Sequence, residues 1–318
     1  MYVRGVLWRL ATKVAIRLSA RNPLIFAMLA RRCRAYGTTL RVRDEGLEIV
    51  EGERVVRLAA EGIQWVPAIA KSFNTYHGAV VPEQQGEYLL VDYSQTRPQR
   101  YARSGLVFEM SGVSEEPDAI EAYFRWYRPS SGEVVFDVGA NCGVSTYYLS
   151  RCVGPSGRVY AFEPDPMSYE LLLKNIAEHG LGNVVPLHFA LAGTTGTATF
   201  HAEGTIASKL ARSGSRHTTG KVMAVETISL TDACNRFGTP TFIKLDIEGA
   251  EIEVLEACKP FLREHPVHLA VDTNHWVHGR LTAKPVEAIL QECGYEASSS
   301  AECGCFMTTW GRPRRPGL

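Results

Sequence analysis

The chain has 318 residues, of which 45% are hydrophobic and 21% are charged, as in an ordinary soluble globular protein. Lysine and arginine together number 34, and so do aspartate and glutamate, so no overall charge points to nucleic acid as a partner. No run of about 18 apolar residues occurs, which excludes a membrane-spanning helix, and the length allows one large domain with an extension or two domains.

Residues 1–36 are predicted to form a basic, amphipathic helical segment. Residues 1–43 hold ten lysines and arginines and no acid, and basic residues recur at every fourth position from 9 to 21. Asn22-Pro23 predicts the cap and first position of a second helix, LIFAMLARRCR. Such a segment can lie on an anionic membrane surface, act as a targeting peptide, or pack on the main domain with its basic face solvated. We predict a cytoplasmic protein and leave peripheral membrane contact through this segment open.

The eight cysteines form no convincing metal or disulfide pattern. No C-x-x-C pair of a structural zinc site is present, and the single Cys303-Gly-Cys305 spacing is a weak signal. Because no convincing signal peptide precedes them, we predict reduced thiols in a reducing compartment, at positions 33, 142, 152, 234, 258, 293, 303 and 305.

Residues 37–115 predict a strand-rich N-terminal extension. GLEIVEGERVVRL alternates apolar and polar residues around Glu51-Gly52-Glu53, which predicts a β-hairpin. EYLLVDYS and GLVFEM predict two further short strands. No motif in this part of the chain carries chemistry.

Residues 116–310 predict one α/β domain, followed by a basic tail at 311–318. A helix is expected over PDAIEAYFRWYRP, and residues 193–232 are more irregular but contain the strand-like KVMAVETISL. Because strands and helices otherwise alternate, we predict a mostly parallel sheet with helices on both faces and ligands at the carboxyl ends of its strands. The expected strands are EVVFDV, GRVYAFEP, NVVPLHFAL, TFIKLDIEG, VHLAVDT and CFMTTWG, and the expected helices are VSTYYLSRC, MSYELLLKNIAEHG, AEIEVLEAC and TAKPVEAILQECG.

Two neighbouring strand ends carry residues that suit a nucleoside-bearing cofactor. In FDVGANCG, glycines at 139 and 143 allow close backbone approach, the following helix favours a carboxylate, and Asp137 can meet a cationic group. A tight strand-to-helix turn explains these glycines about as well. Glu163 ends the next strand, where an acid commonly accepts both ribose hydroxyls, although a solvated or capping glutamate is the plainer alternative. Together the two elements predict a cofactor across the first two strands.

The glycine spacing decides which cofactor is expected. A dinucleotide fingerprint has three glycines around a pyrophosphate, whereas here Asn141 stands where the second glycine belongs and no third glycine follows Gly143. That spacing argues against NAD and FAD. A ribose-bearing cofactor with a free amino-acid end and no phosphates fits better, and S-adenosylmethionine is such a molecule.

The stretch FIKLDIEGAE is the third unusual strand end. Charged and apolar residues alternate along it, and the charged ones are Lys244, Asp246, Glu248 and Glu251. Lys244 and Asp246 are expected to point the same way from a buried strand. Two such charges are expensive to bury unless they are paired or used. We favour use in catalysis over a purely structural ion pair.

In this order, DVGANCG, GRVYAFEPDP, LLLKNIAEHGLGNV and IKLDIEGAE resemble the FkbM-type methyltransferases over about residues 133–300. The resemblance implies a class I methyltransferase (Rossmann-like) fold, S-adenosylmethionine as donor, and methylation of a hydroxyl, typically on a sugar, glycan or polyketide-like product. His179 replaces an asparagine that the family commonly has, and Asp272 replaces a glutamate. Carried over, the expected cofactor contacts are Asp137, Gly139, Asn141, Gly143 and Glu163, and the expected catalytic-side residues are Lys244, Asp246 and Glu248.

Methyl transfer to an alcohol needs a base, because a neutral hydroxyl is a poor nucleophile. Asp246 is the first choice, with Lys244 orienting it or stabilising the developing alkoxide, and His275 and His188 are weaker candidates. In a metal-assisted alternative, Asp246, Asp272 and Asn274 at neighbouring strand ends hold Mg²⁺ against the acceptor oxygen.

Two rival functions stay open at this point. An NAD-dependent oxidoreductase is disfavoured by the glycine spacing, and a non-catalytic methyltransferase-like scaffold is disfavoured because the residues of both sides are intact. RNA or DNA is not an expected substrate, since the catalytic part is acidic and shows no aromatic-basic stripe. The expected substrate is a hydroxyl-bearing small molecule or glycan, and the sequence does not distinguish between them.

Overall fold

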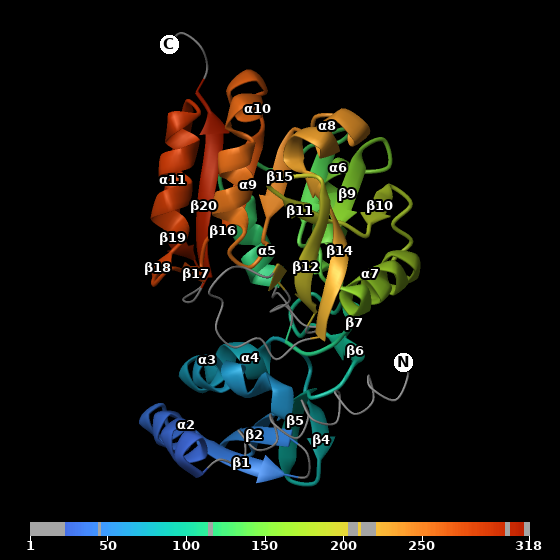
Figure 1. Cartoon of the computed structure of the whole chain (residues 1–318). Helices are drawn as coiled ribbons and strands as arrows, with labels where there is room; N and C mark the ends of the chain where they lie inside the picture. Colours follow the sequence, from blue (N-terminus) through green and yellow to red (C-terminus); the bar gives the residue numbers. More distant parts are fainter. Residues whose placement is uncertain are drawn as a thin grey trace, which may run out of the picture. The chain divides into compact units, whose positions relative to one another are not determined.

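A computed structural model of the chain describes residues 23–43, 46–113, 117–202, 209–210, 221–302 and 306–314. The chain divides into two compact units, Met1–Val113 and Ser114–Leu318 (Figure 1). Most of the predicted basic segment, residues 1–22, lies outside the described residues, as do residues 315–318 of the predicted tail. The described helices include none long and apolar enough to cross a membrane, and membrane contact through residues 1–36 stays a prediction.

The first unit is built on a five-stranded sheet of order β1-β2-β3-β5-β4. The predicted hairpin is confirmed, because β2 and β3 pair antiparallel and Gly52 takes the left-handed conformation (φ 61°) that the turn between them requires. The strands are β1 Thr39–Arg43, β2 Gly46–Glu51, β3 Arg54–Ala59, β4 Glu83–Gln85 and β5 Tyr88–Tyr93, with a separate hairpin of β6 Arg97–Arg100 and β7 Val107–Met110. The helices are α2 Pro23–Ala35, η1 Ala60–Trp65, α3 Val66–Lys71 and α4 Phe73–Gly78, of which only α2 was predicted.

The second unit contains a seven-stranded sheet of order β10-β9-β8-β15-β16-β20-β19, in which β20 runs antiparallel to the other six strands. Its strands are β8 Val134–Val138, β9 Arg158–Phe162, β10 Val184–Leu187, β15 Phe242–Leu245, β16 His268–Asp272, β19 Tyr295–Glu302 and β20 Phe306–Pro313. A four-stranded sheet and a small hairpin accompany it: β11 Ala190–Ala192, β12 Gly196–Ala202, β13 Lys209–Leu210 and β14 Lys221–Ser229, and β17 Trp276–Val277 with β18 Arg280–Leu281.

Helices cover both faces of the seven-stranded sheet (Figure 1). The chain moves outward in one direction from β8 to β10 and in the other from β15 to β16, so right-handed crossovers place the helices of the two halves on opposite faces. This confirms the expected fold class, a class I methyltransferase arrangement with a mostly parallel sheet. The helices are α5 Pro117–Tyr123, α6 Val144–Val153, α7 Pro166–Glu178, α8 Leu230–Phe237, α9 Glu251–Ala257, α10 Lys259–Glu264 and α11 Ala283–Glu292.

Three predicted elements differ in extent from those observed. The helix expected over residues 117–129 ends at Tyr123, because the next turn tightens and the Phe124 and Tyr127 rings pack separately on Phe242. The single strand expected over NVVPLHFAL is split into β10 and β11, which belong to different sheets. The final strand is one arm of the β19–β20 hairpin; β19 was not predicted, because its sequence YEASSSAE is mostly serine, alanine and glutamate.

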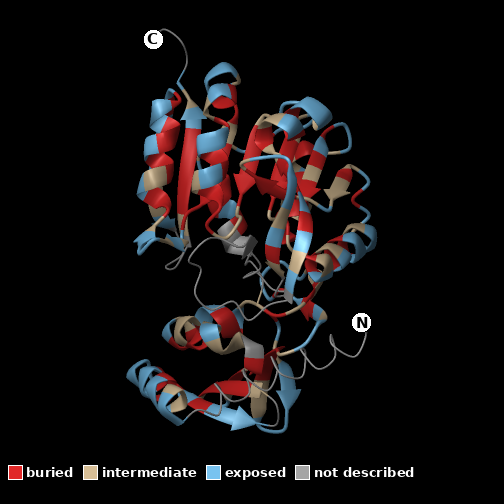
Figure 2. Cartoon of the chain, viewed as in Figure 1, coloured by how far each residue is buried: buried red, intermediate tan, exposed pale blue. Residues whose placement is uncertain are grey.

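The core of the second unit lies between its sheet and helices (Figure 2). The inward side chains of β8, β15 and β16 are buried almost without interruption, as expected of parallel strands covered on both faces. The reversal of strand order falls between β8 and β15, so the carboxyl ends of these two strands form the crevice where such sheets bind ligands.

Candidate active site

The loop after β8 has an unusual backbone. Gly139, Asn141 and Gly143 all have positive φ, at 79°, 49° and 93°. A Cβ on Gly139 would stand 1.8 Å from the Asp246 carbonyl oxygen, so the close approach of this loop to the end of β15 requires a glycine there. A Cβ on Gly143 would stand 2.8 Å from a Leu172 methyl group. Packing within the protein therefore already accounts for both glycines.

A buried ion pair fastens this loop to the sheet. The Asp137 carboxylate accepts hydrogen bonds from Ser145 Oγ (2.9 Å) and Thr146 Oγ1 (2.6 Å), and its other oxygen lies 3.5 Å from Lys244 Nζ. Lys244 Nζ also donates to the Gly139 carbonyl at 2.8 Å. The side chains of Asp137 and Lys244 are 0% and 1% exposed, so both lie beneath the loop and not on the open side of the crevice.

Lys244 also lies near Asp246, the residue that was expected to point the same way from this strand. Its Nζ lies 3.9 Å from Asp246 Oδ2, so Lys244 and Asp246 do point toward one another, but the shorter contact is the one with Asp137. The Asp246 side chain is 19% exposed, which makes it the most accessible of Asp137, Lys244 and Asp246.

Glu163 joins the first two strand ends. Its Oε2 accepts from the Asn141 amide and its Oε1 from the Asp165 amide, each at 2.8 Å. Burial raises the pKa of Glu163 to about 8, against the lowering effect of these two amides. The side chain is 6% exposed, and each oxygen has capacity for one further donor.

The start of α6 fits the amino-acid end of a cofactor. The helix has Gly143 as its N-cap with no side-chain cap, so the amides of its first turn have no side-chain acceptor. Such an end favours a carboxylate, and Glu163 at the end of β9 suits a vicinal diol. The residues present therefore fit S-adenosylmethionine.

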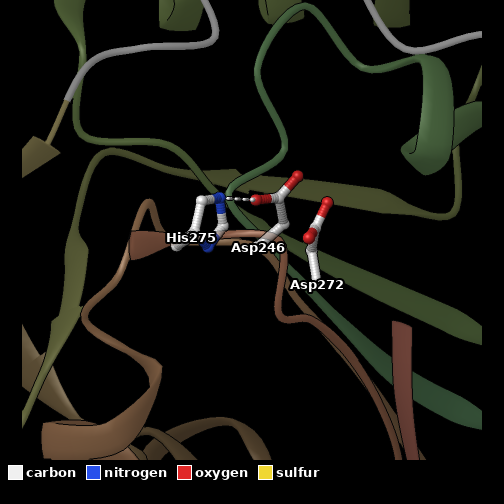
Figure 3. A group of neighbouring side chains, drawn as sticks. All are labelled: Asp246, Asp272 and His275. Atoms are coloured by element: carbon white, nitrogen blue, oxygen red, sulfur yellow. Dashed lines mark ion pairs between the residues drawn. The ribbon is translucent and has the colours of Figure 1, made fainter. Parts of the chain in front are cut away.

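Three side chains, those of Asp246, Asp272 and His275, lie close together at the ends of β15 and β16 (Figure 3). Single ligand-type atoms of Asp246, Asp272 and His275 lie within 4.8 Å of one another. Asp246 follows β15, Asp272 ends β16, and His275 lies three residues further, so two neighbouring strand ends supply all three. One nitrogen and two carboxylate oxygens could hold a divalent cation. The structure thus brings His275, and not only the predicted Asp246 and Asp272, into the candidate metal group.

His275 is held in place by Glu251, for which no role was predicted from the sequence. His275 Nδ1 lies 2.9 Å from Glu251 Oε1, and this oxygen also accepts from the Ile247 and Gly249 amides. Glu251 is fully buried. The opposite nitrogen, Nε2, lies 3.6 Å from Asp246 Oδ1 and 3.6 Å from Glu248 Oε1. Glu248 has a left-handed backbone (φ 55°), which is unusual for a non-glycine residue.

Negative charge dominates this cluster. Burial and the nearby Asp272 raise the pKa of Asp246 to about 7, and burial raises that of Asp272 to about 6. Burial alone would lower the pKa of His275, but the Glu251 and Glu248 carboxylates outweigh it and raise that pKa well above its ordinary value. The imidazolium is therefore the main cation among four carboxylates.

The other candidate residues lie elsewhere. The Asn274 side chain is exposed, and only its amide takes part, donating to Asp272 Oδ1 at 2.8 Å. His188 stacks on Tyr169 and contacts the Pro164 carbonyl, and His179 packs against Tyr147 at the end of α7. The buried Asn175 was not predicted to take part in the site; its side-chain amide donates to the Cys142 carbonyl at 2.8 Å and ties α7 to the loop. The sequence feature that could have indicated this role is a polar asparagine next to the apolar residues of LLLKNIAEHG.

Comparison with known proteins gives one family. A profile described as a methyltransferase FkbM domain matches residues 137–297, slightly more than half of the chain. The chain is also similar to the hexuronic acid methyltransferase AglP of Haloferax volcanii, at 28% identity over 163 residues, which covers 50% of this chain and 62% of that protein. A second relative, the methyltransferase sdnD of Sordaria araneosa, is 26% identical over 197 residues, covering 52% of this chain and 74% of that one.

Solved structures give weaker similarity. An FkbM methyltransferase from Methylobacillus flagellatus has a TM-score of 0.43 at 18% identity, covering 92% of this chain and 59% of that one. A precorrin-6y C5,15-methyltransferase from Geobacter metallireducens has a TM-score of 0.42 at 12% identity, covering 63% and 90%. The chain thus spans less than two thirds of both AglP and the Methylobacillus protein.

Proposed function

This chain belongs to the FkbM methyltransferase family, and from that premise we propose that it transfers a methyl group from S-adenosylmethionine to a hydroxyl of a sugar, glycan or natural product. One observation carries the proposal. The Asp246 backbone lies directly against the glycine loop of the cofactor crevice, and its partly buried carboxyl, which is 19% exposed, has a raised pKa. The proposed proton acceptor and the expected site of the methyl donor are thereby adjacent.

On the donor side, the residues divide into contacts and supports. The first turn of α6 after Gly143 and the Glu163 carboxylate would hold the cofactor, with Asn141 shaping the loop between them. Gly139 and Asp137 would act from beneath by fixing the loop. S-adenosylmethionine, when bound, supplies a methyl carbon activated by a sulfonium.

On the acceptor side, Asp246 is the proposed base. Its carboxylate would take the proton of the acceptor hydroxyl while the methyl group passes to that oxygen and the bond between the methyl carbon and the donor sulfur breaks. A pKa of about 7 suits proton transfer near neutral pH. Lys244 orients Asp246 from 3.9 Å. His275, oriented by Glu251, stands 3.6 Å from Asp246 and from Glu248, and as a cation it stabilises the ionised form of Asp246.

The acceptor class is supported by one relative. AglP is named as a methyltransferase of a hexuronic acid, which is a hydroxyl-bearing sugar acid. An acceptor of this kind agrees with a site that offers Asp246 as a base. The alternative in which a divalent cation assists the reaction rests on Asp246, Asp272 and His275 as its ligands.

Calorimetry tests the proposed function directly. We expect the purified protein to bind S-adenosylmethionine and its demethylated product and to leave NAD unbound. Gly139→Arg should lose binding of both ligands, because the larger side chain cannot fit against the Asp246 carbonyl. Binding of NAD alone would replace the proposal with an oxidoreductase, and binding of neither ligand would favour a scaffold without catalysis.

A further inference from the structure

A cavity of about 580 Å³ lies in the second unit, beside the β17–β18 hairpin. Its walls come from the hairpin, the first turns of α11, and the facing parts of β19 and β20, and its apolar lining includes Leu281, Ala283, Pro285, Ala288 and Met307. This volume is in the range of small-molecule sites, which are mostly apolar with a few polar groups.

The cavity and the acid cluster share one chain segment. β17 begins at the residue after His275, and the Thr282 amide on the far side of the hairpin donates to the His275 carbonyl at 2.9 Å. The Met307 carbonyl, on the opposite wall, accepts from the Thr273 amide at 2.7 Å. Both walls are thus fastened by backbone hydrogen bonds to residues 273–275, which follow Asp272.

The lining has a cation without a partner. Arg280 is exposed, and its guanidinium makes no hydrogen bond or ion pair with any described residue. Lys284 also lines the cavity, but Glu287 Oε2 lies 2.6 Å from its Nζ, so its charge is already matched. Arginine offers a planar fork of donors that suits a carboxylate or phosphate. Arg280 is the group in this cavity that an anion would meet.

An exposed aromatic residue, outside the lining itself, is paired across the hairpin with Leu281 of the apolar wall. Trp276 is 71% exposed and stands directly opposite Leu281 in the hairpin register, so the two side chains lie on the same face. Among the tryptophans, tyrosines and phenylalanines of this unit whose exposure the structure describes, Trp276 is the one that is largely exposed. An aromatic surface next to a reactive centre suits the face of a ring-shaped ligand.

We propose that this cavity is a subsite for the non-reacting part of the methyl acceptor, and that this part combines an apolar group with a carboxylate or phosphate held by Arg280. The inference rests on the proposed function, and it narrows the acceptor from any hydroxyl compound to an acidic, partly apolar one. The anion can come from a sugar acid or from a lipid-linked phosphate, and both present the same chemistry to Arg280.

Calorimetry with defined probes tests the subsite without the methyl donor. The probes are 4-nitrophenyl β-D-glucuronide, the uncharged 4-nitrophenyl β-D-glucoside, and decyl phosphate. We expect Arg280→Gln to weaken one or both acidic probes about tenfold while leaving the glucoside unchanged, as for loss of one charge-assisted hydrogen-bonding group. Ala288→Trp, which fills the cavity, should weaken every probe, and Arg263→Gln, an exposed arginine of α10 outside the cavity, should change none.

The outcomes separate this inference from the proposed function. Tighter binding of the glucuronide assigns the anion to a sugar acid, and tighter binding of decyl phosphate assigns it to a lipid phosphate. Acidic probes that bind Arg280→Gln and the wild-type protein equally overturn the subsite, as does the absence of binding by all three probes. The affinity for S-adenosylmethionine, measured separately on each variant, should stay constant. A wild-type protein that does not bind S-adenosylmethionine would refute the proposed function instead.

Discussion

The two sides of the strand-end crevice differ in how their buried charges are matched. On the donor side, Asp137 faces Lys244 and two hydroxyls, and Glu163 accepts two backbone amides. On the acceptor side, the carboxylates of Asp246, Asp272, Glu248 and Glu251 surround one imidazolium, that of His275.

This difference separates fixed geometry from available chemistry. A buried ion pair with hydrogen bonds on both partners holds one arrangement, which suits a loop that must keep the same shape. In a cluster with surplus negative charge, carboxyl pKa values are raised, so these groups exchange protons near neutral pH, and the cluster also attracts cations. Substitutions in the Asp137–Lys244 pair are therefore expected to change mainly the free energy of unfolding, and substitutions in the acceptor-side cluster mainly turnover.

Matched substitutions on the two sides should change stability in opposite directions. Asp137→Asn leaves Lys244 without its buried counter-ion and should lower the free energy of unfolding by roughly 3–5 kcal/mol. Asp272→Asn removes one surplus charge and should raise it by about 1 kcal/mol at pH 8, where Asp272 is otherwise ionised. Urea denaturation measures both. Equal losses from the two substitutions would mean that the acceptor-side charges are as well matched as the donor-side pair.

Removing the proposed base should affect turnover and spare donor affinity. We expect Asp246→Ala to lower kcat by about 10²–10⁴-fold, the usual contribution of a positioned general base. Steady-state kinetics and calorimetry with S-adenosylmethionine give the two quantities. Glu264→Ala, which removes an exposed carboxylate of α10, serves as the control. Wild-type turnover in Asp246→Ala would show that another group takes the proton.

Substitution of Glu163, the acid expected beside the ribose, should mainly weaken binding of the methyl donor. Glu163→Ala removes the expected partner of the ribose hydroxyls and also frees the Asn141 amide, so we expect about tenfold weaker S-adenosylmethionine binding. Glu170→Ala on α7, an exposed acid, is the matched control. An unchanged dissociation constant would leave Glu163 with a purely structural role.

The raised pKa values predict how stability varies with pH. Asp246, Asp272 and Glu163 have pKa values near 7, 6 and 8 in the folded chain, above their ordinary values, so the folded state binds more protons than the unfolded state between about pH 4 and pH 8. His275, whose pKa is also raised, has the same sign. The free energy of unfolding of the ligand-free protein should therefore fall by about 2 kcal/mol from pH 5 to pH 8. Stability that rises over this range would contradict these raised pKa values, whose largest cause at Glu163, Asp246 and Asp272 is burial.

Metal removal should have the smallest effect. Because His275 already supplies a cation to the acceptor-side cluster, we expect methyl transfer to survive EDTA treatment. Activity assays before and after chelation, with Mg²⁺ or Mn²⁺ restored, decide the point. Loss of activity with recovery on adding metal would assign Asp246, Asp272 and His275 as ligands.

Much of the fold could be predicted from the sequence. The alternation of strands with helices indicated the α/β class, and the helix predicted from Met167 is α7, which begins one residue earlier, at Pro166 after the capping Asp165. Elements with a weak local signal escaped, such as the serine-rich β19, which is a strand because it pairs along its whole length with β20. The motifs DVGANCG and IKLDIEGAE indicated which strand ends carry the chemistry.

The detailed site required tertiary structure. Sequence spacing grouped Lys244 with Asp246, yet the fold gives Lys244 its shorter contact with Asp137, more than a hundred residues earlier. The pairing of Glu251 with His275 likewise depends on β16 lying next to β15. Local patterns determine how each segment folds and which residues end each strand, because periodicity and turn chemistry act over a few residues. Which of those residues meet is decided by strand order, since burial of the whole sheet, and not any short stretch, fixes which strands are neighbours.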